Sequence, residues 1–313
     1  MTESDQEFSN LKSGTISDDS CAIVCLDGTF DIFMGTNRSY DAYFDHRCFV
    51  EASRFEEHWK YAFSRLQESG ATGMSVVIPN KTSVRDVYPL WLPRDGSPVV
   101  RYLGKRQEEN SKLSLIGPRE LFVLLESSDC WLPYDSHWSP IGALAVAELI
   151  LQKLSRTRVS LVELSDFTYY GDLSPHFGIL HRSHTLRQPV AIYSPSILVH
   201  GDGDSFYIGK SSQIFNEQAP DGSLLIVGTS SSGTGESPMN LTYWLSQAFR
   251  RTTFLWSGYL PANLNYSDYT HVIYAGAERF VARVNQIPFK YDFPIESNDF
   301  FDSLDKTARD AQC

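Results

Sequence analysis

The sequence predicts an α/β fold in which a mostly parallel sheet is flanked by helices. Short apolar runs typical of buried strands, such as MSVVIP and SLLIVG, alternate with segments that have helical spacing. The 313 residues suffice for one such domain with a substantial core. A hydrophobic fraction of 42% and a charged fraction of 21% are typical of a globular chain, not a disordered one.

The elements of the first half follow from local patterns. CAIVCLDGTFDIFMG predicts two strands joined by a turn at Asp27-Gly28. MSVVIP and residues 120–127 predict buried strands, and Ser139 and Pro140 predict the start of a helix. Before MSVVIP lies a helix that ends near Gly70, because its apolar residues have helical spacing: Phe55, Trp59, Ala62, Phe63 and Leu66.

In the second half, Ser223–Gly228 predicts a third buried strand, followed by a Ser/Gly-rich turn and a helix within PMNLTYWLSQAF. TTFLWSG and HVIYAGAERFV predict two more strands. The pattern weakens over residues 155–215, which we expect to form an insertion or cap over one end of the sheet. We therefore expect a flexible arm over residues 1–20, one domain over 21–290 and a tail over 291–313.

Charge and cysteine content restrict the function. A net charge of −11 without any basic run argues against nucleic acid or an anionic membrane as partner. No apolar stretch approaches the ~20 residues of a membrane span, and the N-terminal residues lack the pattern of a secretory signal. We therefore expect a cytoplasmic protein. The five cysteines form no Cys-x-x-Cys pair, so neither a disulfide framework nor a metal site is expected.

The stretch YDSHWSP places Asp135, His137 and Trp138 directly before a helix. One interpretation is an ordinary turn with an exposed histidine. The other is the acid and base of a hydrolytic triad, in which a carboxylate orients the histidine that activates a serine. Trp138 would then wall the site. The second interpretation requires a nucleophile from elsewhere in the chain.

Two serines compete for that role. Ser205 lies in a Gly-Asp-Ser block, but its surroundings favour a β-turn between strands. Ser230 comes after Thr229, just beyond a strand that ends in Gly228, and sites gather at such carboxyl ends in parallel sheets. Its own backbone N–H and those of nearby glycines would form an oxyanion hole. Ser231 is its neighbour, and the alternative interpretation is a flexible loop or a phosphate cradle.

The other histidines have no spacing typical of a metal site. We expect each to be structural or solvated, and the roles of three of them stay open. These three are His176, His181 and His184; the rest are His58, His200 and His271.

Four motifs in one order resemble the alginate O-acetyltransferases and related polysaccharide acetylation proteins, the AlgX/AlgJ-like group. YDSHWSPIGA is similar to their Asp-x-His-Trp motif, and LLIVGTSSSG to their nucleophile strand. VVIPNKTSVRDVYPLWLP resembles their Pro-x-Lys segment, and HVIYAGAERFV their late strand. YYGDLS fits a Gly-Asp-Leu segment between the motifs. As in that group, the Asp–His loop precedes the serine strand.

The resemblance implies an SGNH-hydrolase-like fold with Ser230 as nucleophile, His137 as base and Asp135 as orienting acid. No metal ion is implied. The residues expected around the oxyanion or the substrate are Gly228, Thr229, Ser231, Trp138, Arg279 and Phe280. Phe280 stands where the alginate member has a tyrosine.

The implied function is O-acetyl transfer through an acyl-serine to a carbohydrate or glycan intermediate. The acyl donor, acetyl-CoA or an acetylated carrier, would be a co-substrate, and no bound cofactor is expected. Without an export signal, the expected acceptor is a cytoplasmic sugar intermediate or a glycolipid headgroup, and a membrane or biosynthetic-complex partner stays open. Two alternatives are a carbohydrate acetyl esterase with the same triad and a non-catalytic carbohydrate-binding protein of the same fold.

Overall fold

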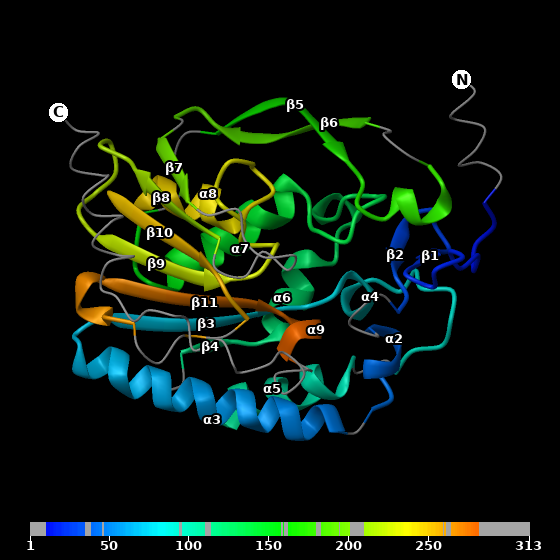
Figure 1. The fold of residues 1–313 in the computed structure, drawn as a ribbon, viewed down its shortest axis with the longest axis horizontal. Helices are drawn as coiled ribbons and strands as arrows, with labels where there is room; N and C mark the ends of the chain where they lie inside the picture. The colour runs from blue at the N-terminus through cyan, green and yellow to red at the C-terminus, as the bar shows by residue number, and fades with distance from the viewer. Residues whose placement is uncertain are drawn as a thin grey trace.

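A seven-stranded sheet forms the centre of the molecule (Figure 1). The computed structural model describes residues 11–34, 39–45, 47–93, 96–109, 114–157, 159, 162–179, 183–193, 195–200, 210–258, 260 and 264–281. The strand order is β4-β3-β11-β9-β10-β8-β7. The pairs from β4 to β10 are parallel, whereas β8 pairs antiparallel with both β10 and β7. The predicted mostly parallel sheet is confirmed.

The register of the parallel strands brings their carboxyl ends to one edge. Gly228 at the end of β9 pairs with Ala275 of β11 and with Trp256 of β10, and Ala277 of β11 pairs with Ile78 of β3. The loops that follow these strands therefore meet at this edge. The strand bounds are β3 Thr72–Ile78, β4 Leu115–Ile116, β7 Ser196–His200, β8 Ser211–Phe215, β9 Ser223–Gly228, β10 Arg251–Trp256 and β11 His271–Ala277.

Helices cover both faces of the sheet because alternate strand residues point to opposite sides. On β9, Leu225 and Val227 pack with α3 (Arg47–Glu68) and α5 (Pro98–Glu109). Leu224 and Ile226 pack with α6, α7 and α8 on the other face. Their bounds are α6 Pro118–Leu125, α7 Pro140–Lys153 and α8 Leu241–Leu245. As predicted, α7 begins at Pro140, and the Ser139 hydroxyl accepts a hydrogen bond from the Gly142 N–H at 3.3 Å.

The prediction of a strand over residues 120–127 is wrong, because this segment belongs to helix α6. Leu121 and Leu125 are fully buried while Val123 is 81% exposed, which is the spacing of an amphipathic helix. Pro118 at the first helical turn is the sequence signal for this start.

The N-terminal hairpin consists of β1 (Ala22–Val24) and β2 (Phe30–Ile32), as predicted. Residues 11–20 differ from the expected flexible arm because they bond to this hairpin: the Gly14 N–H donates to Val24 O at 2.9 Å, and the Ala22 N–H to Ser17 Oγ at 3.0 Å. Residues 1–10 and the tail over 291–313 lie outside the described residues. The first half also contains two short helices: α2 (Ser39–Ala42) comes after β2, and α4 (Lys81–Val84) comes after β3.

The segment expected as an insertion contains long strands. β5 (Val162–Tyr170) and β6 (Ser183–Ala191) pair over their whole length as an antiparallel ribbon, which runs across the top of the view in Figure 1. The 3₁₀ helix η3 (Ser174–Phe177) lies between them in the chain, and β7 and β8 join the main sheet. None of the helices in the described part is both long and apolar enough to cross a membrane.

Candidate active site

The Asp-x-His loop is a short hairpin at the start of α7. Trp131 and Trp138 form an isolated antiparallel bridge, and the Leu132 N–H donates to His137 O at 3.2 Å. Both tryptophans are almost fully buried. The bridge therefore fixes the positions of Asp135 and His137 at the edge of the core.

Within this loop Asp135 holds His137 in one orientation. Asp135 Oδ1 lies 2.7 Å from His137 Nδ1 and accepts the His137 backbone N–H at 2.9 Å. The second carboxylate oxygen accepts the Asp172 backbone N–H at 3.1 Å. Because an ionised carboxylate only accepts hydrogen bonds, Nδ1 carries the proton and Nε2 has the free lone pair of a base.

The charges around the pair favour its ionised form. Burial opposes ionisation of Asp135, yet the charge of His137 and its hydrogen bonds hold the pKa of Asp135 below its ordinary value. Burial likewise lowers the pKa of His137, but the charge and hydrogen bond of Asp135 and the charge of Asp172 together raise it. Arg279 acts in the opposite direction on His137.

Asp172 lies beside the Asp–His pair and was not among the site residues predicted from the sequence. Its Oδ1 accepts the Ser136 N–H at 2.7 Å, its Oδ2 accepts the Ser136 hydroxyl at 2.6 Å, and Oδ2 lies 3.5 Å from His137 Nδ1. A side chain at Gly171 would collide with the carbonyl oxygen of Tyr134, so glycine permits this close approach. The sequence feature that could have identified Asp172 is the Gly-Asp-Leu segment within YYGDLS, to whose aspartate no role was assigned.

Ser230 lies in the turn directly after β9, at the carboxyl edge of the sheet. It is partly exposed, whereas its neighbours Thr229, Ser231 and Ser232 are buried. The amides of Ser232 and Gly233 donate to Thr229 O at 2.9 and 3.3 Å, which closes the turn. Ser230 is therefore the hydroxyl of this run that faces outward.

A side chain at Gly228 would collide with Ser232 Oγ and with the carbonyl oxygen of Ala275, so the strand end requires glycine. This packing sets the turn tightly against β11. From the sequence we expect Gly228 next to the oxyanion. In the structure its lack of a side chain allows the end of β9 and the serine turn to pack closely against β11.

The serine turn and the Asp–His loop are joined by Trp138. Its indole N–H donates to the carbonyl oxygen of Met239 at 2.7 Å, and Met239 lies just before α8. The Leu241 N–H in turn donates to Ser231 O at 3.1 Å. His137 Nε2 is buried and has no hydrogen-bond partner within the described residues, Ser230 included. Such bonds between catalytic groups are frequently long until substrate binds.

The end of β11 adds two buried charged residues, Glu278 and Arg279, at the start of α9 (Glu278–Val281). The Glu278 carboxylate accepts the Asn80 N–H at 2.9 Å and the Ser83 hydroxyl at 2.7 Å, which ties the loop after β3 to β11. Burial outweighs these bonds and raises the pKa of Glu278. Its role is structural support at the same edge of the sheet.

Arg279 extends the charged surroundings of His137. Asp172, Asp31 and Asp135 all lie within electrostatic range of its guanidinium group, which also lies 5.2 Å from the ring centroid of Phe280. Burial nonetheless lowers the pKa of Arg279. The sequence placed Arg279 and Phe280 near the substrate, and the structure places Arg279 among the acids around the base.

Lys81 is a second residue that the sequence reasoning left unassigned. It is 1% exposed, and its ammonium group donates to Phe30 O at 2.8 Å and to Leu132 O at 3.0 Å. It thereby connects the N-terminal hairpin, the loop after β3 and the Asp–His loop. Burial raises the pKa of its neighbour Asp31 to about 6.

Among the residues that the structure describes, two groups of side chains have the atoms to hold a metal ion: Asp135 with His137 and Asp172, and Asp19 with Cys21 and His176. In the first group all four carboxylate oxygens of Asp135 and Asp172 already accept a hydrogen bond from a backbone N–H or from the Ser136 hydroxyl. Its geometry therefore fits an oriented base better than a metal centre.

The other sequence candidates lie elsewhere. Ser205 and His181 fall outside the described residues. The ring of His184 packs 4.5 Å from that of Tyr134, and His271 Nδ1 lies 2.8 Å from Thr270 Oγ1 at the start of β11.

Comparison with known proteins gives a family match and several structural matches. The model of the family described as "SGNH hydrolase-like domain, acetyltransferase AlgX" matches residues 50–256. No curated protein matches. A DHHW family protein from Eubacterium siraeum is 12% identical with a TM-score of 0.50, covering 73% of this chain and 86% of its own.

PatB1 of Bacillus cereus, solved with a sulfonyl adduct, is 13% identical with a TM-score of 0.52 and covers 74% of this chain and 91% of its own. The O-acetyltransferase domain of Pseudomonas putida AlgJ is 16% identical with a TM-score of 0.49 and covers 83% and 92%. At these identities, the first two structures establish a shared fold.

Proposed function

Because the chain belongs to the AlgX family of SGNH hydrolase-like acetyltransferases, we propose that it transfers an acetyl group to a carbohydrate hydroxyl through an acetyl-serine at Ser230. The observation that carries the proposal is the Asp135–His137 hydrogen bond of 2.7 Å. Trp138 and Met239 join this pair to the turn that exposes Ser230. The arrangement supplies an oriented base and an accessible hydroxyl at the carboxyl edge of the sheet.

In the first half-reaction His137 Nε2 takes the proton of Ser230 Oγ as that oxygen attacks the carbonyl carbon of the acetyl donor. The tetrahedral intermediate then collapses. His137 returns the proton to the leaving group of the donor, and acetyl-serine remains. The donor is a co-substrate, acetyl-CoA or an acetylated carrier.

The oxyanion of this intermediate needs hydrogen-bond donors next to Ser230. The amides of Ser232 and Gly233 already donate to Thr229 O. The backbone N–H groups of Ser230 and Ser231 are therefore our candidates for the oxyanion hole, in place of the glycine amides expected from the sequence.

In the second half-reaction a sugar hydroxyl gives its proton to His137 Nε2 and attacks the acetyl carbon. The ester to Ser230 breaks, and its Oγ recovers the proton. Asp135 remains ionised throughout and stabilises the imidazolium that forms at each step. Asp172 acts as a positioning residue, because it holds Ser136 and places a second negative charge 3.5 Å from His137 Nδ1.

The test is the turnover of an acetyl ester reporter with and without a sugar acceptor, for wild type and two variants. Ser230→Ala should abolish turnover. Ser232→Ala is the matched control, because its hydroxyl is buried and donates a long hydrogen bond of 3.4 Å to Ala275 O. Turnover that acceptor does not change, with no acetylated sugar formed, would point instead to the esterase. Equal turnover of wild type and Ser230→Ala would refute the nucleophile.

A further inference from the structure

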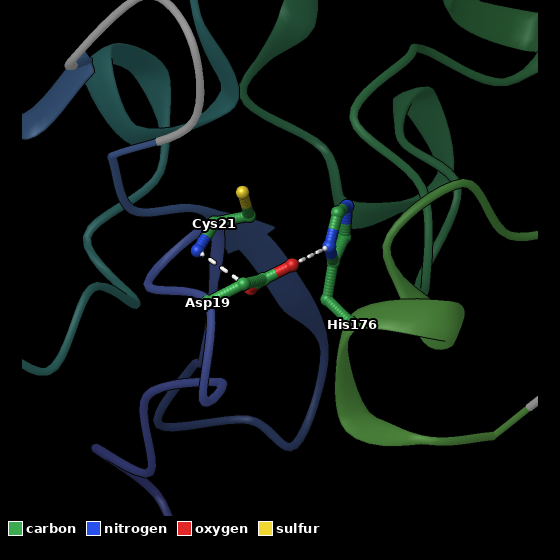
Figure 2. Close-up of side chains that lie close together, drawn as sticks. All are labelled: Asp19, Cys21 and His176. Carbon is green, nitrogen blue, oxygen red and sulfur yellow. Dashed lines mark hydrogen bonds and ion pairs between the residues drawn. The ribbon is translucent and has the colours of Figure 1, made fainter.

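A second cluster of reactive side chains lies where the N-terminal hairpin meets η3. Asp19, Cys21 and His176 each offer one ligand atom, and these atoms all lie within 4.8 Å of one another (Figure 2). Asp19 and Cys21 precede β1, whereas His176 lies more than 150 residues later in η3. Sequence spacing predicted no metal site here because the fold, not a local motif, brings the three together.

Hydrogen bonds from neighbouring residues fix the orientation of the Asp19 carboxylate. Its Oδ1 accepts the Ser17 hydroxyl at 2.7 Å and the Cys21 N–H at 3.0 Å, so Oδ2 faces His176 Nδ1 at 2.6 Å. These hydrogen bonds, led by that of Ser17, hold the pKa of Asp19 well below its ordinary value. Because Oδ1 already accepts two hydrogen bonds, Oδ2 is the oxygen that can reach a bound ion.

The two segments are also packed together independently of the cluster. The Phe177 ring, next to His176, lies 4.7 Å from that of Phe30, and Leu173 shares a buried apolar cluster with Ala22 and Val24. This packing holds the hairpin and η3 next to each other before any ion binds. The cluster itself stays reachable from solvent, since the side chains of Asp19 and His176 are 50% and 31% exposed.

We propose that this cluster binds a divalent cation of the zinc class through Cys21 Sγ, His176 Nδ1 and an oxygen of Asp19. A thiolate, an imidazole and a carboxylate are the donors that zinc takes, and three protein ligands leave a fourth position for solvent. On binding, the Cys21 thiol releases its proton to solvent. The proton with which His176 Nδ1 bonds Asp19 leaves that nitrogen, so the neutral imidazole carries its proton on Nε2.

The rearrangement that the ion requires is small. Tetrahedral zinc with bonds of about 2.0–2.3 Å separates its ligand atoms by roughly 3.3–3.6 Å. The Asp19–His176 contact of 2.6 Å must therefore open by less than about 1 Å, and the partly exposed Cys21 thiol must move inward. His176 follows Asp172 by four residues, so the ion would fasten the hairpin to the segment that holds Ser136.

The test is cobalt(II) titration of the full chain after treatment with a chelator. Wild type should show a thiolate-to-cobalt charge-transfer band in the near ultraviolet together with intense visible bands of a four-coordinate ion, and zinc should bleach both. Cys21→Ser should lose the charge-transfer band. Because loss of even a supporting residue costs 10–100-fold in metal affinity, His176→Ala should weaken zinc binding by at least about tenfold.

Cys48→Ala, which changes a buried thiol on α3, is the matched control and should bind cobalt like wild type. Circular dichroism establishes that each variant is folded. Zinc should raise the melting temperature of wild type but not that of Cys21→Ser. The proposal is overturned if wild type gives no charge-transfer band, or if folded Cys21→Ser keeps it. In that case the Asp19–His176 contact is only a hydrogen bond that joins the two segments.

Discussion

Replacing Asp172 by asparagine should shift the pH dependence of turnover while leaving the loop geometry in place. Asparagine has the shape of aspartate, so its oxygen still accepts the Ser136 N–H and its amide can contact the Ser136 hydroxyl. What disappears is a negative charge 3.5 Å from His137 Nδ1. That charge raises the pKa of His137, so its removal should lower this pKa.

The size of the effect follows from the distance and the exposure. At 3.5 Å two unit charges interact by about 1 kcal/mol in water and about 5 kcal/mol at an effective dielectric constant of 20. Because the Asp172 side chain is 41% exposed, we take the lower value. A free energy of about 1 kcal/mol corresponds to roughly 0.7 pH unit.

The assay is kcat/KM of the acetyl ester reporter as a function of pH. Histidine acts as a base only when neutral, so activity falls as pH drops through the pKa of His137. In Asp172→Asn this acid limb should move to lower pH by roughly 0.5–1 unit, with a plateau that changes less than about tenfold. Asp166→Asn, an exposed residue on β5, is the matched charge control. An acid limb that stays in place or moves to higher pH would refute the reasoning.

Three further predictions concern Asp135, Trp138 and Asp31. Asp135→Asn should lower kcat by about 10⁴-fold, because an amide no longer fixes the Nδ1–H tautomer; a loss below tenfold would contradict this role. Trp138→Phe leaves Met239 O without its 2.7 Å donor and should destabilise the protein by about 1–3 kcal/mol in urea unfolding, with a lower kcat; unchanged values of both would show that the bond does not join the loops. The pKa of Asp31 is raised to about 6, so its contribution to stability is present at low pH and is lost as pH rises through about 6. Asp31→Asn should therefore stabilise the fold by about 1–3 kcal/mol at pH 7–8 and by less at pH 4.5, and an equal effect at both would refute the shift.

The fold was largely predictable where local pattern and burial agree. Ser223–Gly228 is apolar throughout because β9 is covered on both faces, and the start of α7 was visible in Ser139 and Pro140. The segment over 120–127 was misassigned because a short apolar run has no decisive period. Only its burial pattern, with Val123 exposed between Leu121 and Leu125, identifies the helix.

The site was predictable where its residues are close in sequence. Asp135 and His137 lie two residues apart and contact each other through one short loop. Asp172, Lys81 and Arg279 come from other segments, and their roles depend on long-range packing that no local pattern reports. The same holds for His176, whose neighbours Asp19 and Cys21 lie more than 150 residues earlier in the chain.

The central claim is that Ser230 carries the acetyl group between donor and acceptor. The most direct measurement is peptide mass spectrometry of the full chain, quenched in acid after reaction with an acetyl ester donor in the absence of acceptor. We predict one acetyl group on the peptide that contains Ser230, lost when sugar acceptor is added and absent from Ser230→Ala. An unmodified Ser230 in a protein that turns over the donor, or an acetyl group that acceptor does not discharge, would contradict the account.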